Sequence, residues 1–247
     1  MIDRPFVVMP AYNAGATVER VFARIPAEVR RRIARYVVVN DGSTDDTATA
    51  LRRIGKDFPG LAVLTHDRNK GYGAAEKTLL SYALQEGAGA AILLHADGQY
   101  SPEKIPDLLG PLDRGEADIV QGSRMRGGGA LRGGMPFYKF AANKVLTAIE
   151  NHAFGMKLAE YHSGYLVYSR RVLEEVPFGM LSDSYDIDIE MMICGRLRGL
   201  GIKEVAIPTI YAGEVSHLRP VRYGLDVLKI VRKYRLGYYH LLLRTAP

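Results

Sequence analysis

The chain has few of the features that mark secreted, disulfide-bonded or membrane-spanning proteins. Its one cysteine, Cys194, has no second cysteine to pair with, so a disulfide framework is excluded and a reducing compartment is expected. No apolar run approaches the roughly 18 residues that a membrane-spanning helix needs. No positively charged leader followed by a short apolar stretch opens the chain, so we do not expect secretion. These absences predict a cytoplasmic protein without a membrane span of its own.

What the chain does contain is an ordinary globular composition with an uneven distribution of charge. Hydrophobic residues make up 47% and charged residues 24% of the sequence, as in typical soluble domains. From Arg219 onward, seven basic residues accompany one acidic residue, Asp226, and this segment accounts for the whole net charge of +6. Such a segment favours an anionic partner. No recognised nucleic-acid-binding module surrounds it, so we expect no nucleic acid.

The first half of the chain alternates strand and helix patterns with short connections. Short runs bounded by turn residues predict strands at Phe6–Met9, Tyr36–Asn40, Leu61–Thr65, Ala91–Leu94 and Asp118–Gln121. Helical patterns between them cover Thr17–Ile25, Asp45–Asp57, Gly73–Glu86 and Pro102–Arg114. This alternation predicts an α/β fold, with a mainly parallel sheet and helices on both faces.

The pattern changes in the second half. The glycine-rich segment Arg126–Gly134 predicts a mobile loop beside a site. A helix with a broad apolar stripe is expected over Met135–Phe154. Further elements are expected at Tyr165–Tyr168 (strand), Asp186–Leu197 (helix), Glu204–Ile207 (strand) and from Pro220 onward (a helix, with proline at its favoured first position).

A polar cluster follows the apolar run Ala90–Leu94. His95, Asp97 and Gln99 lie at the expected carboxyl end of that strand, the edge where open α/β sheets bind ligands. Oxygen and nitrogen donors at alternate positions suit a hard divalent cation held against a diphosphate, and a solvated turn is the alternative interpretation. Asp41 ends another strand at the same edge, where it can cap a helix or accept a hydrogen bond from a nucleobase or a ribose hydroxyl.

Eight short motifs occur in a characteristic order. They are Val-Met-Pro-Ala-Tyr-Asn at 8–13, Asn-Asp-Gly-Ser-Thr-Asp at 40–45, Asn-Lys-Gly-Tyr-Gly-Ala-Ala at 69–75, His-Ala-Asp-Gly-Gln at 95–99, Gly-Ser-Arg at 122–124, His-Ser-Gly-Tyr at 162–165, Asp-Ile-Asp-Ile-Glu at 186–190 and Glu-Val-Ser-His at 214–217. Together they resemble the family 2 glycosyltransferases of the GT-A fold, in particular the polyprenyl-phosphate (dolichol-phosphate) hexosyltransferase-like branch. The resemblance covers about residues 5–217.

The resemblance implies a role for residues in each motif. Those implied in nucleotide binding are Pro10, Ala11, Tyr12, Asn13, Asp41, Lys70, Gly71 and Asp97. Those implied in holding Mg²⁺ or Mn²⁺ are Asp97, Gln99 and His217, with His95 beside them. Those implied near the sugar or the acceptor are Ser163, Gly164, Arg124, Arg126 and Arg132. The general base is expected among Asp186, Asp188 and Glu190, with Asp188 as the first choice.

Three positions depart from the pattern of the family. His95 stands where an Asp is common, which removes one negative charge near the metal and puts the metal preference in question. Asn40 stands where a first Asp is frequent, and Ala14 stands where a Glu often follows Tyr-Asn. Neither the base of the donor (uracil or guanine) nor the hexose can therefore be carried over from the family. The sequence does not predict an oligomeric state.

The resemblance also implies a division of the chain. Residues 1–217 would form the catalytic domain, with a nucleotide-binding half over about 1–122 and an acceptor half over about 123–217. Residues 218–247 would form a basic amphipathic tail. This tail and the apolar helix from Met135 predict a peripheral enzyme on the cytoplasmic face of an anionic membrane.

The expected activity is an inverting, metal-dependent transfer of a hexose from a UDP- or GDP-sugar to a polyprenyl phosphate. A soluble saccharide or natural-product acceptor is the alternative, and a catalytically inactive nucleotide-sugar-binding module is the non-enzymatic one. A nicotinamide-binding fold is disfavoured. The spacing Gly71-x-Gly73-x-x-Glu76 lacks the third small residue and follows the third expected strand instead of the first.

Overall fold

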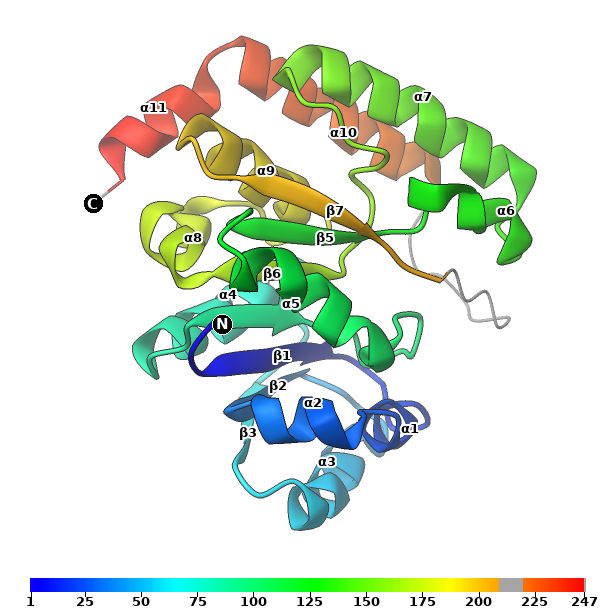
Figure 1. The fold of residues 1–247 in the computed structure, drawn as a ribbon, viewed down its shortest axis with the longest axis vertical. Helices are drawn as coiled ribbons and strands as arrows, with labels where there is room; N and C mark the ends of the chain where they lie inside the picture. Colours follow the sequence, from blue (N-terminus) through cyan, green and yellow to red (C-terminus); the bar gives the residue numbers. More distant parts are fainter. Residues whose placement is uncertain (209–219, 247) are drawn as a thin grey trace.

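The computed structural model describes residues 1–208 and 220–246 (Figure 1). These residues form one sheet with the strand order β3-β2-β1-β4-β6-β5-β7. The strands are β1 (Pro5–Ala11), β2 (Arg35–Asp41), β3 (Leu61–His66), β4 (Ala90–Leu93), β5 (Ile119–Ser123), β6 (Leu166–Ser169) and β7 (Ile202–Ala206). Only β6 runs against its neighbours in this sheet, pairing antiparallel with β4 and with β5. The mainly parallel sheet predicted from the sequence is confirmed.

The helices lie between and after the strands. They are α1 (Val18–Ala23), α2 (Ala27–Arg32), α3 (Thr47–Asp57), α4 (Tyr72–Gln85), α5 (Ile105–Asp113), α6 (Gly129–Arg132), α7 (Phe137–Phe154), α8 (Arg170–Glu175), α9 (Ile187–Leu197), α10 (Pro220–Arg235) and α11 (Tyr238–Thr245), with short 3₁₀ turns η1 (Pro102–Lys104), η2 (Arg126–Gly128) and η3 (Phe178–Met180). The glycine-rich segment forms η2 and α6, and its mobility stays a prediction. Helices α2, α6, α8 and α11 were not expected, because four to eight residues are too few to show a clear helical period.

Both faces of the sheet are covered, which explains why its central strands are apolar without alternation. Phe6 and Val8 of β1 face a core formed with α4, α8, α9, α10 and α11. Val7 and Met9 of the same strand face a second core formed with α1, α2, α3 and α5. Side chains that alternate along a strand therefore all find apolar partners.

The last helices pack on the domain. Helix α10 contacts α7, and α11 contacts both α10 and α9; in Figure 1 these helices lie at the end of the molecule opposite to α3. Val227, Ile230 and Tyr239 are fully buried in the first core. Among the described residues, no helix is both long and apolar enough to cross a membrane. The predicted boundary at residue 217 falls outside the described residues and stays a prediction.

Candidate active site

The carboxyl ends of four parallel strands meet at one edge of the sheet. Ala11 of β1 pairs with Asn40 of β2, and Asp41 at the end of β2 pairs with His66 of β3. Strand β4 pairs with the other side of β1 and leads directly into His95. The motifs at 8–13, 40–45, 69–75 and 95–99 are thus brought to one edge, as the fold rule for open α/β sheets requires.

Asp41 connects three segments at this edge. Its carboxylate is buried and accepts hydrogen bonds from the backbone N–H groups of Lys70 (2.9 Å) and Gly71 (3.0 Å). His66 Nδ1 lies 2.6 Å from Asp41 Oδ1. Gly71 has a φ of +98°, and a Cβ there would come within 2.7 Å of the carbonyl oxygen of Asp183. Asp41 therefore positions the loop that enters α4, and its contact with a nucleotide stays a prediction.

The first two strand-to-helix loops are tied together beside it. Asn13 Oδ1 accepts a hydrogen bond from Thr44 N (2.9 Å), and Asn13 N donates to Ser43 Oγ (3.0 Å). These bonds hold Asn13 at a φ of +49°, a conformation that asparagine tolerates better than most residues. The preceding Tyr12 is 47% exposed, so its ring at this edge is accessible to a ligand.

The polar cluster after β4 is packed against aromatic rings. Tyr72 Oη and His95 Nε2 are 3.1 Å apart, and the ring of Tyr100 meets His95 edge-on with centroids 5.0 Å apart. Burial lowers the pKa of His95, and the opposing effect of Asp97 does not overcome it. A neutral imidazole is the form that can bind a metal. Asp97 Oδ1 accepts a hydrogen bond from Gln99 N at 2.9 Å.

The donor set at Asp97 fits a divalent cation that a diphosphate shares. Among the described residues, no three His, Cys, Asp or Glu side chains converge to hold a metal by themselves. Mg²⁺ does not need such a cage, because one or two carboxylates, phosphate oxygens and water complete its coordination. Asp97 is half-buried, and its Oδ2 makes no hydrogen bond to the described residues. His217 lies outside the described residues.

Asp188 faces the same cluster from the first turn of α9. It is 6% exposed, and its Oδ2 accepts a hydrogen bond from Tyr72 Oη at 3.1 Å. Gly164 separates it from His95: a Cβ at Gly164 would lie 2.8 Å from His95 Cε1 and 3.1 Å from Asp188 Oδ2. Only glycine leaves room for this approach. The structure thus brings together His95, Gly164 and Asp188, which are far apart in the sequence.

Glu76 of α4 completes this group and was not assigned any role from the sequence. It is fully buried, accepts a hydrogen bond from Tyr168 Oη at 3.3 Å, and is close enough to Asp188 for the two carboxyl groups to affect each other's pKa. Burial and then the neighbouring Asp188 raise the pKa of Glu76 well above its usual range. Burial likewise raises the pKa of Asp188, to about 7. Burial thus favours the protonated form of both carboxyl groups, and Asp188 titrates near neutral pH.

A signal for Glu76 did exist in the sequence. Glu76 stands among small and apolar residues on the side of α4 that faces the sheet, where a charged side chain is seldom fully buried without a partner. That pattern marks a buried carboxyl group, although it does not say which residue meets it.

The two other acids of the 186–190 motif have different partners. Asp186 accepts a hydrogen bond from Ser182 Oγ at 2.6 Å, just before α9 begins. Glu190 is 1% exposed and accepts hydrogen bonds from Ser182 N and Tyr239 Oη, both at 2.7 Å, and it pairs with Lys233 Nζ at 3.3 Å. Glu190 thus links α9 to the last two helices, and Asp188 is the acid that faces His95.

The predicted acceptor residues follow β5. Arg124 Nη2 pairs with the fully buried Glu160 at 2.9 Å and also donates to the carbonyl oxygen of His162. Arg126 is 56% exposed in its side chain, 3.7 Å from Glu204. Arg132 ends α6.

The predicted sugar-binding residues precede β6. Gln121 Nε2 donates to the carbonyl oxygen of Ser163 at 3.0 Å, and Gly164 N donates to Tyr100 Oη at 2.9 Å. These bonds hold the backbone of Ser163 and Gly164 against β5 and the segment after β4. Their contact with a sugar stays a prediction.

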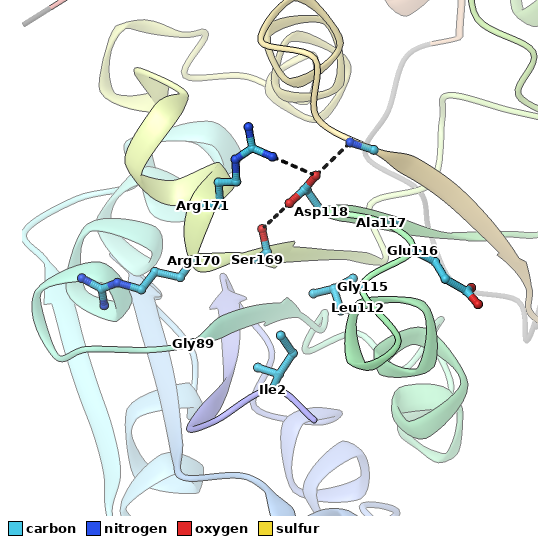
Figure 2. A pocket seen from close by; sticks show the side chains of 11 residues that line it. Ile2, Gly89, Leu112, Gly115, Glu116, Ala117, Asp118, Ser169, Arg170 and Arg171 are labelled. Atoms are coloured by element: carbon cyan, nitrogen blue, oxygen red, sulfur yellow. Dashed lines mark hydrogen bonds and ion pairs between the residues drawn. The ribbon is translucent and has the colours of Figure 1, made fainter.

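A cavity of about 540 Å³ lies at the opposite edge of the sheet (Figure 2). It is lined by Ile2, Gly89, Leu112, Gly115, Glu116, Ala117, Asp118, Ser169, Arg170, Arg171 and Gly201. Gly89 and Asp118 directly precede β4 and β5, so this is the edge where the parallel strands begin. It contains none of the residues predicted for the chemistry.

Comparison with known proteins agrees with the fold and the motifs. The family model of Glycosyl transferase family 2 matches residues 6–177. An uncharacterized protein of Methanocaldococcus jannaschii is 31% identical over 85% of this chain and 82% of its own. The UDP-N-acetylglucosamine–dolichyl-phosphate N-acetylglucosaminyltransferase of Methanococcus voltae is 26% identical over 83% of this chain and 85% of its own.

A solved structure has the same fold. Glucosyl-3-phosphoglycerate synthase from Mycobacterium tuberculosis, crystallised with Mn²⁺, UDP and glucosyl-3-phosphoglycerate, superposes with a TM-score of 0.67 and 23% identity. The superposition covers 95% of this chain and 79% of the other. The predicted GT-A fold is confirmed. With the family model covering most of the chain, the protein belongs to glycosyl transferase family 2 and is a glycosyltransferase.

Proposed function

We propose that this enzyme transfers a hexose from a nucleotide-diphosphate sugar to a polyprenyl phosphate, with inversion at the sugar carbon. The observation that carries the proposal is the convergence of His95, Gly164 and Asp188 at the carboxyl edge of the sheet, next to Asp97. A proton acceptor and a candidate cation ligand then lie at the same edge of the sheet.

The donor half of the site follows from Asp97. A divalent cation, Mg²⁺ or Mn²⁺, would be held by Asp97 with Gln99 and His217, and it would neutralise the departing diphosphate. The loops of Tyr12, Asn13 and Asp41 would bind the nucleoside. UDP-sugars are the first donors to test, because the Methanococcus voltae relative is named for one and the solved neighbour holds UDP.

The acceptor half follows from Asp188. A phosphate monoester loses its second proton with a pKa of about 6, so the monoanionic fraction of the acceptor still carries that proton, and a carboxylate that titrates near pH 7 can take it. The acceptor oxygen then attacks the anomeric carbon. The bond from that carbon to the diphosphate breaks, and its electron pair leaves with the nucleoside diphosphate. The dolichyl-phosphate acceptor in the name of the Methanococcus voltae relative supports a lipid acceptor here.

A transfer assay tests the proposal. The purified chain is mixed with radiolabelled UDP-sugars, Mn²⁺ or Mg²⁺, and polyprenyl phosphate in detergent, and label is counted in the organic phase with UDP release measured in parallel. We expect equal amounts of lipid-linked sugar and UDP, both abolished in Asp97→Ala. Asp107→Ala, which removes an exposed acid on α5 paired with Lys104, serves as the matched control and should keep full activity.

Two results would count against the proposal. Transfer to a soluble phosphate ester such as glycerol phosphate, with none to the lipid, would show that the acceptor is soluble and not a polyprenyl phosphate. UDP binding by calorimetry without turnover on any acceptor would make the chain an inactive nucleotide-sugar-binding module.

A further inference from the structure

Helix α7 buries several polar side chains and exposes several large apolar ones, although Phe154, Leu146 and Ile149 also pack inward. Its inward side carries Asn143, Thr147 and Glu150, all of which are buried. Its outward side carries Phe137, Tyr138 and Val145, which are 73%, 64% and 61% exposed. A helix on a water-soluble surface normally turns its apolar stripe to the core. The outer side of α7 therefore suits an apolar environment better than water.

The outer side of α10 and α11 mixes leucines with arginines. Leu225, Leu228, Leu236 and Leu241 are 55%, 46%, 74% and 63% exposed. Three exposed basic residues accompany them: Arg232, Arg235 and Arg244. The acid in this part, Asp226, is paired with Lys229 at 2.7 Å. The surface thus combines apolar side chains with positive charge and has no unpaired acid among its described residues.

These two surfaces adjoin each other and the candidate site. Helix α10 contacts α7, and α7 follows α6, which leaves the carboxyl end of β5 through η2 (Figure 1). Leu131 of α6 is 45% exposed at the start of this stretch. The apolar and basic side chains therefore extend from the rim of the site along the end of the molecule opposite to α3.

We propose that this outer helical surface, formed by Leu131, Phe137, Tyr138, Val145, Leu225, Leu228, Arg232, Arg235, Leu236, Leu241 and Arg244, docks on an anionic lipid membrane. The apolar side chains enter the interface between headgroups and acyl chains, and the arginines contact lipid phosphates. Charge complementarity selects the membrane, since every unpaired charge named here is positive. Its purpose rests on the proposed function: docking at the rim of the site presents a lipid-linked phosphate to Asp188.

A single tryptophan reports on the docking directly, because the natural chain has none. Phe137→Trp places an indole at the most exposed aromatic position of α7. With vesicles of phosphatidylcholine and phosphatidylglycerol, we expect its emission to shift to shorter wavelength and to be quenched by brominated lipid. Val63→Trp is the matched control, since Val63 is 43% exposed on β3, at the far end of the molecule in Figure 1, and its emission should not change. An unchanged emission from Phe137→Trp would overturn the proposal.

Charge reversal tests whether vesicle binding depends on this surface or only on the overall positive charge of the protein. The triple variant Arg232→Glu, Arg235→Glu, Arg244→Glu should float with anionic vesicles at least about tenfold less than the natural chain, because each basic residue near the surface contributes binding energy. The control is Arg20→Glu, Arg31→Glu, Arg52→Glu, the same change of charge at exposed positions on α1, α2 and α3. Equal losses in both variants would overturn the proposal.

The outcome is independent of the transfer assay. Flotation needs no donor sugar. If the enzyme uses a soluble acceptor and still floats with vesicles, the proposed docking surface stands and the proposed lipid acceptor is wrong. If the chain transfers sugar to detergent-dispersed polyprenyl phosphate but does not float with vesicles, the proposed function stands and the proposed docking surface is wrong. In that second case a protein partner would be the occupant of this surface.

Discussion

Two buried carboxyl groups in this enzyme lie in similarly dry surroundings and carry opposite pKa shifts. Glu160, under α7, is fully buried, and burial acts to raise its pKa; Arg124 at 2.9 Å and two backbone N–H groups outweigh that effect and lower it. Among the described residues, no cation acts on the pKa of Asp188. Burial raises its pKa to about 7, although hydrogen bonds from Glu76 and Tyr72 act in the other direction.

The comparison shows that burial alone does not decide the charge of a carboxyl group. The neighbour that replaces water decides it. An arginine makes Glu160 a permanent anion, which suits a fixed structural link between β5 and the segment before β6. Burial that no cation among the described residues offsets makes Asp188 a group that gains and loses a proton near neutral pH, which suits proton transfer.

The largest expected effect is a loss of transfer activity, and it concerns Asp188. Asp188→Asn keeps the shape of the side chain but cannot accept a proton, so we expect the transfer rate to fall by about 10²–10⁴ while UDP affinity is retained. Steady-state kinetics and calorimetry measure the two quantities. Asp107→Asn, at an exposed acid of α5 that pairs with Lys104, is the matched control and should stay near the natural rate. Equal loss of UDP binding and rate in Asp188→Asn would make it a binding residue.

The next largest effect is a loss of folding stability, and it concerns Glu160. Glu160→Gln removes the buried anion that pairs with Arg124 Nη2, so we expect the free energy of unfolding to fall by about 3 kcal/mol at neutral pH. Urea denaturation measures it. The double variant with Arg124→Met should recover part of the loss, since both charges are then absent. A loss below about 1 kcal/mol, the range of surface pairs, would show that this pair is effectively solvated.

The pH dependence of stability should have opposite signs at the two positions. The pKa of Glu160 is lowered by folding, so the loss in Glu160→Gln should be full above the unfolded pKa and shrink as pH falls through the folded pKa. The pKa of Asp188 is raised by folding, so its ionisation destabilises the fold as pH rises toward and through 7. Asp188→Asn should therefore gain stability relative to the natural chain between about pH 5 and pH 8, by roughly 1–3 kcal/mol. Urea titrations across that pH range test both signs. Parallel curves of unfolding free energy against pH for the two variants would contradict the opposite pKa shifts.

The smallest effect concerns Glu76 as a positioning residue. Its proton stabilises the carboxylate of Asp188, so Glu76→Leu should move the acidic limb of the rate profile to higher pH by about one unit. Glu76→Gln still offers an N–H donor and should restore most of the natural profile. A loss of rate at all pH values without a shift would indicate a structural role only.

The sequence was informative where a local pattern has one physical meaning. Apolar runs bounded by turn residues became β1, β2, β4 and β5 within one or two residues, because short apolar runs flanked by turn residues are typical of fully buried strands. The stripe that predicted a helix at Met135–Phe154 was correct about the helix. It did not say that Asn143 and Glu150 would face inward and Phe137 outward. A helical period identifies two sides of a helix, and only packing decides which of them meets the core.

The amino-acid sequence by itself determined the order of strands and helices and membership of the family, and it predicts that the chemistry lies at the carboxyl edge of the sheet. Each of these depends on local runs, turns or motifs, which can be recognised without knowing what a segment contacts in the fold. The tertiary structure decided that Glu76 meets Asp188, that Glu160 meets Arg124, and that Glu190 holds the last helices. Residues far apart in the chain form these contacts, and their charges depend on neighbours and on excluded water that no local pattern contains.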